Sequence, residues 1–490
     1  MKTRIANLVL LSAASMLSAQ TPPATQPTLS PAPGTGAGPQ PPAYTPVRWN
    51  ENYSYLKDPA ARKDPFDPIK YIPLNDEGDI YLSLGGQARY RYEWFENATF
   101  GAGPQDKDGY HLLRTTAHAD LHLGRNVRFF VQGISALATD RTGGDRPGID
   151  QNDIDIHQAF GDFVVPFDGG GSLTLRGGRQ NLLYGAQRLI SPLDWTNTRR
   201  TFDGGKVSLA APKNNTLDFF YVSPVVVDDS SLDSFNDNVA FAGLYDTLML
   251  PEVFKGAGTR VEAYLLYLDN FTATFAEGLD DEKRYTVGGR FYTNPKPWDF
   301  DVEAAYQFGE FGDGDISAWM FATEAGYTLA DVPLTPRPFI GLDIASGDDD
   351  PTDGDLETCN QLFPLGHAYF GYIDAIGRQN IIDVHPGIEI TLLAEKRNIK
   401  KLSLRVDYHL FWRQSEDDAV YNVAGGILRG DGGSDARYVG SELDLLLNWQ
   451  IDRHLSAYFG YSHFFAGDFI EETGASDDID FVYGALQFTF

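Results

Sequence analysis

The chain ends on a stretch, Asp480 to Phe490, in which apolar and other side chains alternate. Its apolar residues share one parity, the pattern of a strand with one apolar face: Val482, Leu486, Phe488 and Phe490. In water, an exposed apolar strand invites edge-to-edge aggregation. In an outer membrane, the same strand can close a barrel, with its apolar face toward lipid and its last aromatic at the interface. A last core strand of a soluble β-sandwich shows the same pattern, so the rest of the chain must decide.

The same alternation recurs from residue 82 onward. In the first such segment, Leu82 and Tyr90 fall on one parity and Arg91 falls on the other. We count about eighteen such segments of about ten residues each, an even number within the range of bacterial outer-membrane barrels. The sequence therefore predicts an all-β fold: a transmembrane antiparallel β-barrel of about 18 strands over residues 80–490, with a lumen that is open or partly plugged.

The connections between these segments favour a barrel over a secreted β-solenoid or tandem sandwiches. A barrel with both termini in the periplasm alternates short turns on that side with longer outer loops. Short turns are expected at residues 124–126, 167–171, 211–215, 294–297, 330–334, 395–400 and 450–454. Longer loops are expected at residues 97–108, 140–153, 181–200, 223–237, 270–282, 346–383, 415–437 and 466–477. Two connections depart from the alternation, at residues 247–256 and 311–314.

The N-terminal part of the chain indicates export from the cytoplasm. Residues 1–20 carry Lys2 and Arg4, then a short apolar run and small residues, which is typical of a cleavable signal peptide. Residues 21–47 are rich in Pro, Thr and Gly and predict a disordered linker. Residues 48–79 are aromatic and charged, and we expect an irregular periplasmic segment that packs at or inside the barrel mouth. The predicted location is the cell outer membrane, with both termini in the periplasm.

Several other classes of protein are disfavoured. Beyond the N-terminus, the chain has no run of about twenty apolar residues, which a transmembrane helix would need. A formal net charge of -29 argues against nucleic acid as a partner. No nucleophile motif such as Gly-x-Ser-x-Gly is present, so we expect no enzyme, no catalytic residue and no cofactor.

Metal binding is also not expected. His118 and His122 share one strand face, but an extended strand separates them by about 13 Å, too far for one ion. Residues 348–355 hold five acids that could wrap Ca²⁺, yet they lack the pattern of an EF-hand loop, and a solvated loop tip fits them better. Cys359 is the one cysteine in the sequence and can form no internal disulfide.

If the apolar parity faces lipid, the other parity lines a lumen that is too wide for side chains alone to fill. This parity carries charges of both signs. Arg side chains could bind the carboxylates of a passing solute, while acidic partners keep the affinity weak enough for release. Alternatively, these charges pair across neighbouring strands and only stiffen the wall.

Several stretches resemble the alginate export family of outer-membrane porins. They are Leu175 to Gln180, with its Gly-Arg-Gln ending, His409 to Arg413, Gly440 to Asp444, and residues 360–369 in the longest outer loop. The resemblance covers residues 81–490 and implies an eighteen-stranded barrel and a channel suited to anionic polyuronate. It also implies that Arg179 and Arg413 face the lumen. The full predicted set of pore or substrate-binding residues is Arg89, Arg91, Arg114, Arg176, Arg179, Arg290, Arg405, Asp407, Arg413, Glu442 and Asp444.

Some departures from the family weigh against alginate itself. The exporter closes its periplasmic side with a long last turn, whereas residues 450–454 form a short one. Ala457 and Phe459 stand where the exporter has pore arginines. We therefore predict a monomeric outer-membrane channel, surrounded by outer-membrane lipid, for anionic carbohydrate such as polyuronate or for small carboxylates. The alternative is a structural or adhesive barrel plugged by residues 48–79.

Overall fold

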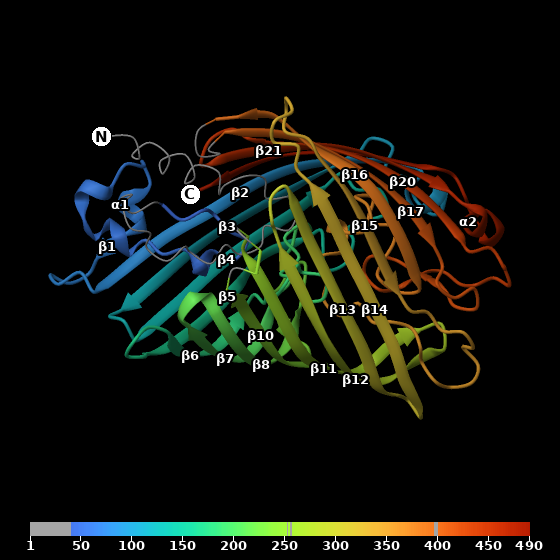
Figure 1. Cartoon of the computed structure of the whole chain (residues 1–490), viewed down its shortest axis with the longest axis horizontal. Coiled ribbons are helices and arrows are strands. Elements are labelled where there is room, and N and C mark those ends of the chain that lie inside the picture. The colour runs from blue at the N-terminus through green and yellow to red at the C-terminus, as the bar shows by residue number, and fades with distance from the viewer. Residues whose placement is uncertain (1–40, 252, 255–256, 396–399) are drawn as a thin grey trace, which may run out of the picture.

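The computed structural model describes residues 41–251, 253–254, 257–395 and 400–490. Eighteen antiparallel strands form one closed barrel (Figure 1). The ring closes because β2 pairs with β3 on one side and with β22, the last strand, on the other, so that Ala88 lies opposite Phe488. The predicted fold class is confirmed. The predicted signal peptide and residues 21–40 of the predicted linker lie outside the described residues.

The strands of the barrel wall follow the chain in order. They are β2 (Ile80–Glu96), β3 (Tyr110–Leu123), β4 (Val127–Thr139), β5 (Asn152–Pro166), β6 (Ser172–Gln180), β7 (Phe202–Ala211), β8 (Asn215–Val226), β10 (Val239–Leu250), β11 (Thr259–Phe275), β12 (Gly278–Thr293), β13 (Trp298–Phe311), β14 (Gly314–Tyr327), β15 (Arg337–Ala345), β16 (Ile381–Ala394), β17 (Lys401–Trp412), β20 (Tyr438–Gln450), β21 (Leu455–Ala466) and β22 (Ile479–Thr489).

The remaining elements are short and do not belong to the ring of eighteen strands, although β1 pairs with β2 and β9 with β8. The strands among them are β1 (Ile72–Pro73), β9 (Ser234–Phe235), β18 (Val420–Tyr421) and β19 (Ile427–Arg429). The helices are α1 (Asp67–Lys70) and α2 (Asp468–Thr473), and the 3₁₀ turns are η1 (Arg48–Asn50), η2 (Ser54–Lys57), η3 (Pro59–Ala61), η4 (Ala98–Gly101), η5 (Pro212–Asn214) and η6 (Gly366–Ala368). In the part of the chain that the structure describes, no helix has the length and apolar character needed to cross a bilayer.

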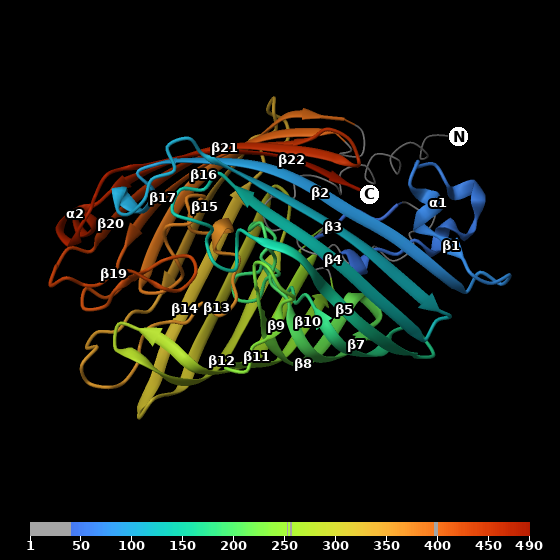
Figure 2. The ribbon, with the colours of Figure 1, turned by 180° about the vertical axis from the view of Figure 1, so that it is seen from behind.

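The two ends of the barrel differ. Residues 41–79 and the C-terminus lie together at one end, which we call the terminus end (Figures 1 and 2). Long connections gather at the other end, the loop end. The loop expected at residues 270–282 is wrong: β11 continues to Phe275 and β12 begins at Gly278. The extended hairpin contains a bulge between Asn270 and Ala273. At its tip, the Tyr421 hydroxyl accepts a hydrogen bond from the backbone N–H of Ala276.

Alternation along each strand separates an apolar outer face from a polar inner face. On β2, Tyr90 is 47 % exposed, whereas its neighbours Arg89 and Arg91 are 3 % and 1 % exposed. The same holds on β3, where Leu113 is exposed and Arg114 is buried. Large apolar side chains thus cover the outside of the wall, and charged ones are enclosed by it. This is the distribution that a barrel surrounded by lipid requires.

Residues 41–79 pack against the terminus end. Arg48 donates hydrogen bonds to the backbone oxygens of Gly86 (3.2 Å) and Phe490 (2.9 Å). The ring of Phe66 lies 5.2 Å from that of Phe490, measured between centroids. Trp49 reaches further inside, where its ring meets Phe160 of β5. The segment therefore contacts both the rim and the inner wall of the barrel.

Two connections from the loop end fold back into the barrel and narrow it. Residues 181–201 join β6 to β7, and residues 346–380 join β15 to β16. They meet at a parallel bridge between Ile190 and Phe363. Phe363 packs edge-on against Phe202 and Phe241 of the wall, so this contact is part of a buried apolar cluster. The sequence predicted long connections here but not their inward course.

Candidate functional site: the barrel lumen

Three predicted pore arginines hold the 181–201 loop against the wall. Arg89 donates to the carbonyl oxygens of residues 194 (2.9 Å) and 196 (2.7 Å), and Arg91 donates to that of residue 195. Arg114 forms an ion pair with the Asp194 carboxylate at 2.9 Å and also bonds its carbonyl oxygen. These arginines therefore bind the chain's own loop in this structure.

The loop carboxylate at this anchor is kept ionised by its neighbours. Burial alone would raise the pKa of Asp194, but the guanidinium groups of Arg114, Arg199 and Arg89 outweigh that effect and hold the pKa below its usual range. Arg199 also comes from the loop, 3.0 Å from the Asp194 carboxylate. The anchor thus combines charges of the wall and of the loop.

Two predicted acids hold the 346–380 loop. Glu442 accepts the backbone N–H of Ile373 at 2.8 Å, and Asp444 accepts that of Tyr372 at 3.4 Å. The two loops are themselves joined, because the indole of Trp195 donates to Asp374 at 2.8 Å. The lumen charges on this side also position loop backbone.

Arg290 and Arg413 also bind carboxylates or backbone oxygens of this chain. Arg290 of β12 lies 3.1 Å from Glu262 and 2.9 Å from Asp301, and Arg188 of the 181–201 loop reaches the same Asp301 at 3.0 Å. Arg413 follows β17 directly and donates to backbone oxygens at residues 416, 434 and 436. It organises the connection between β17 and β20.

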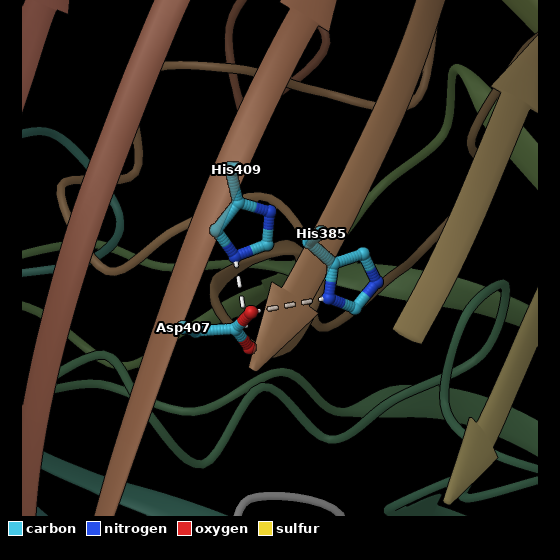
Figure 3. Close-up of side chains that lie close together, drawn as sticks. All are labelled: His385, Asp407 and His409. Carbon is cyan, nitrogen blue, oxygen red and sulfur yellow. Dashed lines mark hydrogen bonds and ion pairs between the residues drawn. The ribbon is translucent and has the colours of Figure 1, made fainter. Parts of the chain in front are cut away.

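Arg405 and Asp407 form a buried ion pair on β17, with a nitrogen–oxygen distance of 2.7 Å. Two histidines face this carboxylate, His385 of β16 and His409 of β17 (Figure 3). His409 belongs to a motif shared with the family, but neither histidine is among the predicted pore residues. Only the pairing of β16 with β17 brings them together.

The structure places Arg176 and Arg179 in different surroundings. Arg176 is buried and forms an ion pair with Asp162 of β5 at 2.7 Å. Arg179 shares the parity of the exposed Leu175 and pairs with Asp203 of β7 at 2.9 Å, near the loop end. The two arginines of this motif therefore do not meet at one site.

A cavity of about 460 Å³ lies near the terminus end, between residues 47–50 and the inner faces of β3 to β11. Its charged lining has more bases than acids: Arg125, Arg128, Arg176, Lys206 and Arg260 against Asp162, Asp218 and Glu262. The ring of Trp49 forms one side, with the Arg176 guanidinium 3.9 Å and the Lys206 ammonium 5.3 Å from its centroid. The lining thus has a small excess of basic groups, most of which are paired with carboxylates such as Asp120, Asp162 and Asp218.

Sequence reasoning missed Trp49 and Lys206 as members of this cavity. Lys206 could have been found, because it falls on the parity opposite Val207 and Leu209. For Trp49, the sequence predicted only that its segment packs at or inside the barrel mouth, because no periodic pattern connects that segment to a particular position on the wall. The place of Trp49 depends on long-range contacts such as the bond from Arg128 to its carbonyl oxygen, 2.6 Å long.

The barrel is similar to solved structures from Pseudomonas aeruginosa. OpdK, solved with vanillate, has a TM-score of 0.54 and 9 % identity, over 83 % of this chain and 98 % of that one. OccK2 (OpdF), in complex with glucuronate, has a TM-score of 0.53 and 14 % identity, over 86 % and 98 %. OccK11 (OpdR) has a TM-score of 0.51 and 11 % identity, over 84 % and 96 %. These likenesses support the fold.

No curated protein matches this sequence significantly. A family model described as alginate export matches residues 80–483, which is nearly the whole barrel from the first residue of β2 into β22. The match agrees with the closed wall of eighteen strands and with the motifs that the sequence shares with that family. The chain therefore belongs to the alginate export family of outer-membrane β-barrels.

Proposed function

We propose that this protein is an outer-membrane channel for small anionic solutes, namely uronic acids and other small carboxylates. The observation that carries the proposal is the basic cavity of about 460 Å³ beside Trp49. A basic lining attracts carboxylates, and an indole ring offers an apolar face to a sugar or an aromatic acid. OpdK with vanillate and OccK2 with glucuronate are neighbours in fold, and their ligands belong to the same chemical class.

The inward loops favour a small solute over a polysaccharide. The 181–201 loop is tied to β2 and β3 by Arg89, Arg91 and Arg114, and to β13 by Arg188. A polymer strand would need both inward loops to leave the lumen, whereas a monosaccharide acid needs only a path around them. The sequence predicted two classes of solute, polyuronate-like carbohydrate and small carboxylates. We therefore favour small acids over a polyuronate.

The acids of the cavity have a role in release. Lys206 lies 3.5 Å from Asp218, and Arg176 is paired with Asp162. A solute carboxylate must compete with these resident carboxylates, so it binds weakly and can leave, as conduction requires. In this proposal the terminus end faces the periplasm, both termini lie there, and the protein acts as a monomer.

Reversal potentials in a planar bilayer under a KCl gradient test this proposal. We expect anion preference in the wild type and partial block of the current by glucuronate. Lys206→Met removes one charge of the cavity, so the reversal potential should shift toward that of a cation channel and the glucuronate block should weaken several-fold. Lys283→Met is the matched control, because Lys283 of β12 does not line the cavity and forms a partly exposed pair with Asp281.

Some outcomes would contradict the proposal. Cation preference in the wild type would show that the cavity does not determine ion selectivity. Equal shifts of the reversal potential in the two lysine variants would show the same. Complete absence of current would favour the second candidate, a plugged structural or adhesive barrel. That candidate is supported by the same inward loops and by Trp49 inside the wall.

A further inference from the structure

A buried group of imidazoles and carboxylates lies on the inner wall, apart from the basic cavity. His385 Nδ1 lies 3.3 Å from one oxygen of Asp407, and His409 Nε2 lies 3.9 Å from the other. Figure 3 shows both nitrogens pointing toward this carboxylate from the two sides. All three residues are at most 4 % exposed, and their nearest nitrogen and oxygen atoms lie within 4.8 Å of one another. Three potential metal ligands thus converge on one point.

Strand register concentrates negative charge around this point. Asp343 of β15 lies directly opposite Asp383 of β16, and Asp407 of β17 lies directly opposite Asp444 of β20. Like charges directly opposite each other destabilise a sheet unless a cation compensates them. The strands therefore place four carboxylates where they need positive charge between them.

The resident arginines compensate only part of this charge. Arg378 pairs with Asp343, and Arg405 pairs with Asp407. Three buried oxygens find no hydrogen-bond partner among the described residues: Asp383 Oδ1, Glu442 Oε2 and Asp444 Oδ2. Their residues are 0 to 1 % exposed. Buried carboxylate oxygens without partners are costly, so a cation between these strands would stabilise the wall. Glu442 and Asp444 can relieve part of this cost by sharing a proton.

His409 is oriented as a ligand. Its Nδ1 lies 2.9 Å from Asp383 Oδ2, which fixes that nitrogen as the protonated one and leaves Nε2 with a free lone pair. A carboxylate behind a metal-binding histidine is a recurring arrangement that sets the ring and raises its basicity. The free Nε2 faces Asp407 and also Asp444, 3.7 Å away.

We propose that His385, Asp407 and His409 bind one divalent transition-metal ion, with Asp444 beside the open coordination position. Two imidazoles and a carboxylate suit zinc and its first-row neighbours, whereas calcium and magnesium prefer oxygen ligands alone. Two ligands that each lie about 2.0–2.1 Å from a tetrahedral ion are about 3.3–3.4 Å apart. The 3.3 Å from His385 Nδ1 to Asp407 Oδ1 meets this condition. Without a metal ion this contact is a hydrogen bond donated by His385 Nδ1, so metal binding must release that proton. The proposal is independent of the solute that the barrel conducts.

Zinc binding to the untagged, chelator-stripped protein in detergent tests this proposal. We expect one Zn²⁺ per chain by equilibrium dialysis and metal analysis. Co²⁺ should give the visible absorption of a four- or five-coordinate nitrogen and oxygen site. His385→Ala and His409→Ala should each weaken binding at least tenfold. His111→Ala is the matched control, because His111 lies on the outer face, 2.6 Å from the hydroxyl of Tyr90, and should not affect stoichiometry.

A second variant avoids removing a ligand that the barrel could need for folding. A Cβ at Gly341 of β15 would lie 1.9 Å from His385 Nε2, so Gly341→Ala must displace the imidazole. It should weaken Zn²⁺ binding, whereas Gly177→Ala, where a Cβ meets no atom within 4 Å, should leave it unchanged. Absence of zinc from the folded wild type, or full binding in both histidine variants, would overturn the proposal. In that case, protonated histidines supply the missing positive charge.

Discussion

At the scale of single residues, Lys70 of α1 is the clearest anomaly among residues 41–79. It is 1 % exposed, and its ammonium finds no hydrogen-bond partner among the described residues. The group lies 5.1 Å from the ring centroid of Tyr53 and 5.7 Å from that of Phe490. Burial, with a further contribution from Arg48, lowers the pKa of Lys70 to about 7.

This pKa predicts that the segment docks more firmly as pH rises. The value is about 10.4 when the lysine is in water, so the undocked segment binds more protons than the docked one between about pH 7 and pH 10.4. Docking therefore strengthens across that window and is weakest, and constant, below about pH 7. Protease protection of residues 41–79 measured from pH 6.5 to 9.5 should increase with pH.

Lys70→Met should remove this dependence and protect the segment at every pH. Lys57→Met is the control, since Lys57 is exposed and bonds the carbonyl oxygen of Glu77. If the slope with pH persisted in Lys70→Met, the titrating group would lie elsewhere.

At the scale of elements, the 181–201 loop depends on Arg114. This side chain is fully buried and meets Asp194, the carbonyl oxygen of Thr196 and Gln87. Arg114→Met removes the bonds to two loop carbonyl oxygens and leaves the partly exposed Asp194 carboxylate with Arg199, so the loop is held less tightly. We expect the loop to be cut faster by proteases and the mean bilayer conductance to rise.

Arg337→Met provides the comparison. Arg337 is also buried, but its partners Asp299 and Glu324 belong to the wall. This variant should lower barrel stability while leaving the loop protected and the conductance near that of the wild type. Equal loop cleavage in both variants would show that Arg114 does not hold the loop.

At the scale of the whole molecule, the outer face of the wall must match lipid. Leu265 lies near the middle of β11 and is 47 % exposed. Leu265→Arg should cost about 2–4 kcal/mol, as cationic side chains do near the centre of a bilayer. Guanidinium unfolding in lipid vesicles measures this cost, with Leu265→Met as the control. A cost below about 1 kcal/mol would place the lipid belt elsewhere on the barrel.

The wall could be predicted from the sequence because alternation is a local property. Leu113 and Arg114 are adjacent, and their chemistry alone assigns them to opposite faces. The contents of the lumen could not be predicted in this way. Besides Gln87, the partners of Arg114 come from a loop about eighty residues away, and backbone carbonyls carry no sequence signal. His385 and His409 likewise become neighbours only through the register of β16 and β17.

The bonds from Arg48 to the oxygens of Gly86 and Phe490 also imply an order of two assembly steps, pairing of the first and last strands and docking of residues 41–79. Gly86 belongs to the first strand of the wall, and Phe490 follows the last strand. The two oxygens lie side by side only once those strands have paired. During assembly, therefore, the segment that is synthesised before the barrel takes its final place after the barrel has shut. The Arg48 guanidinium thus joins residues 41–79 to both of the strands that close the barrel.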